Sequence, residues 1–142
     1  MLSQYSYPIV CSDQFEITVA FYEDYFNYVP AFEMDGFTIL KREDRDDMFL
    51  AVMDAEHKAI PEQYRKTTAG IILNYPVSDA KLAYQELYWE GLNILSEPED
   101  AVCGRKHFFV EDPNGILIDV AENIDIDSLL GSDKKSDLCM VA

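Results

Sequence analysis

The stretch RKHFFVEDPNGILIDV, residues 105–120, decides how this chain folds. Two apolar runs flank the turn DPNG, a pattern that predicts two antiparallel strands joined by a tight hairpin. Each strand carries one titratable side chain, His107 on the first and Asp119 on the second. The hairpin is therefore both a structural landmark and the first place to look for a functional site.

The geometry of the turn determines which side chains of this hairpin share a face. Residue alternation puts His107 and Phe109 on one face of the first strand. A plain four-residue loop pairs Phe108 with Asp119, whereas a bulge shifts the pairing by one residue. Only the shifted register brings His107, Phe109 and Asp119 to the same face. The His–Asp pair can then serve to set the register, to anchor a ligand, or to act as an acid and base.

Length and composition indicate a globular protein with one domain over residues 1–142. Hydrophobic residues make up 49% of the 142 residues, which is enough for a core without disulfide or metal. The sequence lacks an apolar run of the roughly 20 residues that a membrane helix needs, and it lacks a signal-peptide pattern. Three cysteines without a CxxC pairing are typical of free thiols in a reducing compartment, so we expect a cytoplasmic protein.

The charge balance is unusual and restricts the class of partner. Eleven basic residues against 27 acidic ones give a formal net charge of −16. A field of that sign repels nucleic acid and anionic membranes, and it raises the local concentration of cationic ligands. We therefore expect no nucleic-acid or membrane partner, and the acidic surface serves either solubility alone or the recognition of a cation.

The first half of the chain reads as a strand, a helix and three further strands. The apolar side chains expected on one helix face are Ile17, Phe21, Tyr25 and Tyr28, after a cap at Asp13. The turn pair Asp35-Gly36 predicts a hairpin between the second and third strands. The expected strands are residues 5–11, 29–34, 37–42 and 48–54.

The second half repeats this order of elements. Ser78 or Asp79 caps a helix that ends before Gly91, with an expected buried face of Ala80, Ala83, Tyr84, Leu87 and Tyr88. Strands are expected at residues 69–77 and 92–96 and in the opening hairpin, with a loop at 97–103. The Ser-Asp pairs at 12–13 and 78–79 mark the same joint, 66 residues apart. The chain divides into a βαβββ module at 5–54, a linker at 55–68, a second βαβββ module at 69–123, and a tail at 124–142.

Two βαβββ halves, with SDAKLAYQELYWEGLNILSEPED followed by GRKHFFVEDPNGILIDV, resemble the glyoxalase/bleomycin-resistance/dioxygenase family, the vicinal oxygen chelate superfamily. The resemblance covers roughly residues 5–123 and is most specific at Gly104-Arg105 and at residues 112–115. It implies an α+β fold in which the two modules form a curved mixed sheet around a concave cavity. It also favours the shifted hairpin register and a homodimer. The family hosts isomerases, dioxygenases and metal-free drug binders on one scaffold, so the fold does not name the function.

The family's metal enzymes use His and Glu ligands on particular strands, and most of these positions differ here. They fall on Ser6, Ile72 and Asp119, so one ligand of three is retained. A divalent ion needs about three protein donors with open positions for substrate. The other histidine, His57, lies in the polar linker and is expected to be solvated. We therefore expect no metal cofactor.

The resemblance places six side chains in the ligand cavity: His107, Phe109, Asp119, Arg105, Tyr7 and Tyr75. Aromatic walls with a few polar groups suit planar or cationic molecules. The favoured function is metal-independent binding of a small cationic or aromatic molecule. Two alternatives remain open, a metal-dependent lyase, isomerase or dioxygenase with an altered site, and a domain used for protein association.

Overall fold

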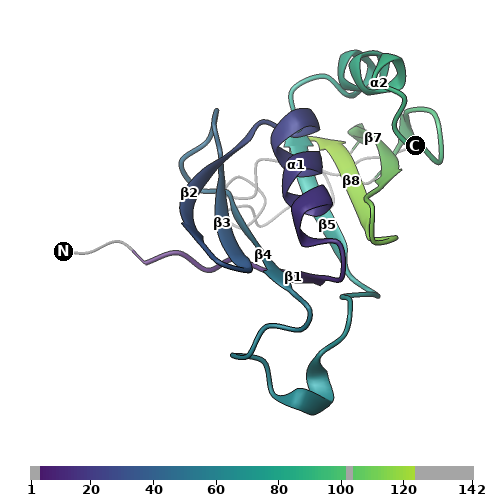
Figure 1. The fold of residues 1–142 in the computed structure, drawn as a ribbon. Coiled ribbons are helices and arrows are strands. Elements are labelled where there is room, and N and C mark those ends of the chain that lie inside the picture. The colour runs from purple at the N-terminus through teal and green to yellow at the C-terminus, as the bar shows by residue number, and fades with distance from the viewer. Residues whose placement is uncertain (1–3, 102–103, 124–142) are drawn as a thin grey trace, which may run out of the picture. The chain divides into compact units, whose positions relative to one another are not determined.

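The computed structural model describes residues 4–101 and 104–123, which form two compact units (Figure 1). Among the described residues, unit 1 comprises residues 4–71 together with Asp112–Ile116, and unit 2 comprises residues 72–111 and 117–123. The short segment that unit 1 takes from the second half is the turn of the opening hairpin. The main segment of unit 1 ends at Ile71, and the linker predicted from the sequence spans residues 55–68.

Unit 1 contains one helix and a four-stranded mixed sheet of order β1-β4-β3-β2. Strand β1 runs parallel to β4, and the other neighbours are antiparallel. The elements are β1 (Ile9–Ser12), α1 (Phe15–Tyr25), β2 (Tyr28–Met34), β3 (Phe37–Arg42), β4 (Phe49–Asp54) and the 3₁₀ turn η1 (Glu62–Tyr64). Strand β1 is thus shorter than the expected strand 5–11, and the other three strands agree with their predicted ranges to within one residue.

Unit 2 repeats this topology with the sheet order β5-β8-β7-β6. Strand β5 is parallel to β8, and the β8–β7 and β7–β6 pairs are antiparallel. The elements are β5 (Ile72–Val77), α2 (Ala80–Trp89), β6 (Glu99–Asp100), β7 (Lys106–Glu111) and β8 (Leu117–Glu122). The predicted α+β class with two βαβββ modules is confirmed.

The third element of unit 2 differs from the prediction. The segment 92–96 forms only an isolated bridge, between Ile94 and Val110, and the paired strand β6 lies in the predicted loop. Backbone bonds still tie this segment to β7, because the Leu95 amide donates to Phe109 and the Glu111 amide donates to Asn93. The apolar pattern located the strand's place in the sheet but not its regular pairing.

In each unit the helix packs on one face of its sheet. Every second side chain of the strands points towards the helix and fills the space between helix and sheet. In unit 1 this face includes the fully buried Val10, Leu40 and Val52. In unit 2 it includes Phe108, whose ring lies 5.5 Å from that of Tyr84 on α2, and Val120. These helix-covered faces form the core of each unit.

The buried faces of the two helices differ from the faces predicted from the sequence. In α1 the buried side chains are Thr18, Phe21 and Tyr22, whereas Ile17 is 57% exposed. The prediction missed Thr18 because it counted only apolar residues, and Thr18 is buried through hydrogen bonds to Ser12 and Asn114. In α2, Ala80 and Leu87 are buried as expected, but Tyr88 is 59% exposed.

Turn and cap residues follow their sequence signals closely. Gly36 and Gly91 have φ of +73° and +78°, the left-handed conformation that their hairpin and helix-end positions require. The Asp79 side chain caps α2 by accepting from the Leu82 amide at 3.2 Å. In contrast, α1 has Gln14 at its N-cap rather than Asp13, without a side-chain cap bond.

The Ser-Asp pairs are one residue out of step with the structural repeat. Strand β1 ends at Ser12 and β5 at Val77, while the helix N-caps are Gln14 and Asp79. The equivalent joints are thus 65 residues apart.

The tail at 124–142, Cys103 and Cys139 lie outside the described residues, and Cys11 is a free, partly exposed thiol in β1. Among the described residues, neither helix is long and apolar enough to cross a membrane.

Candidate functional site

The sheet face that α2 leaves open carries three of the six side chains predicted for the site. In the β7–β8 ladder, Phe109 pairs with Asp119 and His107 pairs with Ala121. Directly paired residues project to the same face, so His107, Phe109 and Asp119 lie together. The shifted register is therefore confirmed, and the register that pairs Phe108 with Asp119 is excluded.

His107 and Asp119 form a direct, partly buried pair. Nδ1 of His107 lies 2.8 Å from Oδ1 of Asp119, and each side chain is 17% exposed. When Nδ1 donates to the carboxylate, Nε2 of the neutral ring is left as an acceptor directed away from the pair. The second carboxylate oxygen also has acceptor capacity, so the pair offers a ligand two polar contacts of fixed orientation.

Phe109 adds an aromatic surface beside this pair. Its ring centroid lies 5.2 Å from that of His107, with the ring planes inclined by 66°. The aromatic side chain is also the direct cross-strand neighbour of Asp119. A negative carboxylate next to an aromatic ring is an arrangement that attracts cations and planar groups.

Two further polar residues share this face, and the sequence reasoning missed both. Asn74 on β5 is exposed and lies in register with Asp119, and Glu99 on β6 is exposed and lies in register with His107. Asn74 could have been predicted from the sequence. Strand alternation puts it on the same face as Ile72, the position that matches one of the family's metal ligands. Glu99 had no such signal, since β6 fell within a predicted loop.

The other three predicted site residues lie outside the β7–β8 ladder. Tyr75 pairs with Val120, so it lies on the helix-covered face and is only 6% exposed. Arg105 directly precedes β7, and its Nε is buried without a hydrogen-bond partner among the described residues. Tyr7 precedes β1 in unit 1, where it is partly exposed.

The open face of unit 1 has the same layout but a mostly apolar surface. Ile39 of β3 lies in register with Ala51 of β4, and Ala51 with Ile9 of β1. The pairing of β2 with β3 shifts by one residue between Pro30 and Phe32. Other members of the face are Phe32, Met34, Phe37, Lys41, Phe49 and Met53.

The positions that match the family's metal ligands do not form a metal centre. Ser6 is exposed before β1, and Ile72, at the start of β5, pairs with Leu117 rather than with Asp119. Among residues 4–101 and 104–123 there is no group of three or more His, Cys, Asp or Glu side chains placed to hold a metal ion. His57 lies in the linker, where its Nδ1 accepts from the Ala59 amide. The donor set therefore does not fit a divalent metal of the family type.

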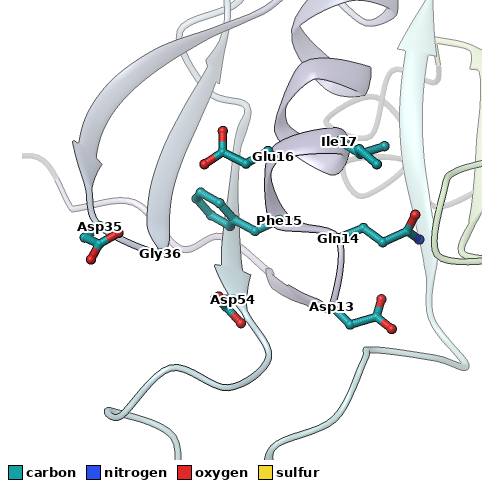
Figure 2. A pocket seen from close by; sticks show the side chains of 8 residues that line it. All are labelled: Asp13, Gln14, Phe15, Glu16, Ile17, Asp35, Gly36 and Asp54. Carbon is teal, nitrogen blue, oxygen red and sulfur yellow. The ribbon is translucent and has the colours of Figure 1, made fainter.

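A shallow cavity of about 400 Å³ lies in unit 1 around the start of α1 (Figure 2). Asp13 and Glu16 flank the helix N-terminus, where negative charge is stabilised by the exposed amides. Asp54 accepts from the Glu56 amide in the turn that follows β4, and Asp35 belongs to the β2–β3 turn. Each of these carboxylates has a local structural reason, so the cavity is a weaker candidate than the face around His107 and Asp119.

Comparison with known families gives one match that covers most of the chain. The family model described as the glyoxalase/bleomycin resistance protein/dioxygenase superfamily matches residues 5–120. No curated protein matches the chain at a significant level.

Solved structures with this fold support the topology at low sequence identity. A superfamily member from Sphaerobacter thermophilus has a TM-score of 0.71 at 17% identity, covering 86% of this chain and 98% of that one. A glyoxalase/bleomycin resistance protein/dioxygenase from Nocardioides has a TM-score of 0.66 at 18% identity, covering 88% and 87%. A bleomycin-binding protein in complex with bleomycin has a TM-score of 0.61 at 22% identity, covering 86% and 100%. At these identities the likeness shows the fold alone.

Proposed function

Because the chain belongs to the glyoxalase/bleomycin resistance protein/dioxygenase superfamily, we propose that it binds a small cationic or aromatic molecule without the help of a metal. The binding surface is the open face of unit 2, centred on His107, Phe109 and Asp119. The proposal rests mainly on this cluster, in which a carboxylate, an imidazole and an aromatic ring occupy adjacent places on one face.

Each member of the cluster has a distinct role in this proposal. Asp119 supplies the charge that attracts a cation, and His107 holds the carboxylate in place through the 2.8 Å contact. Phe109 supplies a ring for stacking or for a cation–π contact, which contributes about 0.5–2 kcal/mol. The exposed Asn74 is available as a hydrogen-bonding group for polar parts of the ligand.

The charge of the whole chain supports a cationic ligand. A net charge of −16 raises the concentration of cations near the protein and speeds their association. The bleomycin-binding protein shows that a chain with this fold can hold a small molecule, although its identity to this chain is only 22%. We further expect a homodimer in the cytoplasm, where the three cysteines would stay reduced.

The proposal is tested by isothermal titration calorimetry with a planar aromatic cation, 1-methylquinolinium. Quinoline supplies the neutral match and 2-naphthoate the anionic one, so charge and shape are separated. We expect 1-methylquinolinium to bind more tightly than quinoline, and 2-naphthoate to bind least. Asp119→Asn removes the charge with little change of shape and should weaken the cation about tenfold, as expected for the loss of one charge-assisted contact.

Asp24→Asn is the matched control, because it removes one negative charge from an exposed position on α1. If both variants bound the cation equally weakly, the effect would come from the overall charge of the protein, and this would contradict a site at Asp119. Binding that does not depend on ligand charge would contradict the role of the carboxylate. Purified protein containing about one divalent ion per chain would instead favour the metal-dependent lyase, isomerase or dioxygenase reading.

A further inference from the structure

The turn between β7 and β8 is organised around one buried carboxylate. Asp112 is 5% exposed, and its Oδ1 accepts from the amides of Asn114 at 2.7 Å and Ile116 at 2.9 Å. The Asp112 amide donates to the Ile116 carbonyl at 2.9 Å, which closes the loop. Gly115 adopts a φ of +82°, a conformation that glycine takes without strain. The loop thus has a defined shape set by its own sequence.

The same turn is bonded to the core of unit 1. The Tyr22 hydroxyl donates to Oδ2 of Asp112 at 2.8 Å, and both groups are buried. The Asn114 side chain accepts from the Ser12 hydroxyl at 2.6 Å and donates to the Thr18 hydroxyl at 3.0 Å. These contacts join α1 and β1 to a turn about 90 residues further along the chain.

The Tyr22–Asp112 bond is maintained by burial. Burial raises the pKa of the Tyr22 hydroxyl, and the neighbouring Asp112 carboxylate raises it further. The hydroxyl therefore stays protonated and remains a donor over the ordinary pH range. A hydrogen bond to a charged acceptor in a buried place is among the stronger single contacts in a fold.

This turn controls the register of the two strands that carry the candidate site. Glu111 and Leu117 are the last paired residues before the turn, and the next pair on the site face is Phe109 with Asp119. In a hairpin the loop fixes the register, and a slip of one residue moves a whole set of side chains to the other face. Such a slip would pair Phe108 with Asp119 and separate the carboxylate from His107 and Phe109.

We propose that Asp112 and Tyr22 are positioning residues that hold the β7–β8 register, and thereby assemble the face formed by His107, Phe109 and Asp119. Neither residue belongs to that cluster, and they act through the turn. The inference deepens the proposed function and rests on it only where ligand binding is measured. The register itself can be measured without a ligand.

The test compares Tyr22→Phe with Tyr25→Phe, its control on the same helix. Both changes remove one hydroxyl, but the Tyr25 ring contacts Phe21 and takes no part in the network at the turn. Amide hydrogen exchange is followed by NMR in both sheets. In Tyr22→Phe we expect exchange in the β7–β8 amides to speed up about tenfold more than in the β2–β3 amides, because local opening of the hairpin becomes easier. Tyr25→Phe should show no such difference between the sheets.

The result that overturns the proposal is an even change in both sheets, since a merely stabilising contact would affect all amides alike. Unchanged exchange in Tyr22→Phe overturns it as well. Asp112→Asn should give the same pattern more strongly, and Tyr22→Phe carries the test if the Asp112 variant does not fold. Binding of 1-methylquinolinium should fall about tenfold in Tyr22→Phe. If wild-type protein does not bind this probe, the proposed function fails, while the exchange pattern still decides the positioning role.

Discussion

Ala51 of β4 and Asp119 of β8 occupy equivalent places, each three residues before the end of its strand. Ala51 lies between Ile9 and Ile39, whereas Asp119 lies between Asn74 and Phe109. The two sheets share their strand order and their helix-covered cores, yet the open face of unit 1 is mostly apolar and that of unit 2 carries more polar side chains.

This difference separates the part of the sequence that specifies the fold from the part that is free for function. The helix-covered face is mostly apolar in both units, because burial of apolar side chains there stabilises each unit. The open face varies more between the units, and it carries a fully buried alanine at one equivalent position and a partly exposed aspartate at the other. Function on this fold is therefore to be sought on the open faces.

The largest expected effect comes from exchanging the two equivalent residues. Ala51→Asp places a carboxylate at a position that is 0% exposed and lies between two isoleucines. A buried charge without a partner costs about 3–5 kcal/mol, so we expect the free energy of unfolding to fall by about this amount in urea denaturation.

The reciprocal change, Asp119→Ala, is the control for this exchange. It removes one partner of a pair whose side chains are each 17% exposed, so the remaining histidine keeps access to water. We expect a loss of about 1 kcal/mol. Similar losses in the two variants would mean that the open faces do not differ in their tolerance of charge.

The Tyr22 hydroxyl should also make the stability of the protein depend on pH, with a smaller effect. The folded-state pKa of Tyr22 is raised above its ordinary value near 10, so the folded protein keeps a proton that the unfolded chain releases. This contribution is complete below pH 10 and is lost as the pH rises above it, by up to about 1.4 kcal/mol per pH unit. We expect a steeper loss of stability above pH 10 in the wild type than in Tyr22→Phe. Parallel curves for the two proteins would contradict it.

The smallest effect compares the two helix starts. Asp79→Ala removes the cap of α2 and should cost about 1 kcal/mol. Gln14→Ala changes an N-cap without a cap bond, although it removes the exposed contact from the Gln14 amide to the Pro113 carbonyl, and should cost less. Thermal unfolding of the two variants measures the difference. A greater loss for Gln14→Ala would show that the contact with Pro113 matters more than capping.

The strands and turns could largely be predicted from local patterns, but the buried faces of the helices could not. Ile17 is apolar yet exposed, and Thr18 is polar yet buried, because distant partners at Ser12 and Asn114 satisfy the Thr18 hydroxyl. The pair of His107 and Asp119 was foreseen as a possibility, since both residues lie on neighbouring strands. Its existence depended on a register that the residues alone left open between two alternatives.

The sequence by itself determined the order of elements, the duplicated module and the glycine turns at Gly36 and Gly91, because periodicity and left-handed conformations act over a few neighbouring residues. Only the tertiary structure decided the β7–β8 register, the burial of Tyr75 and the bond between Tyr22 and Asp112. These features depend on groups that are far apart in the chain, and their energies exist only after the chain has brought the groups together.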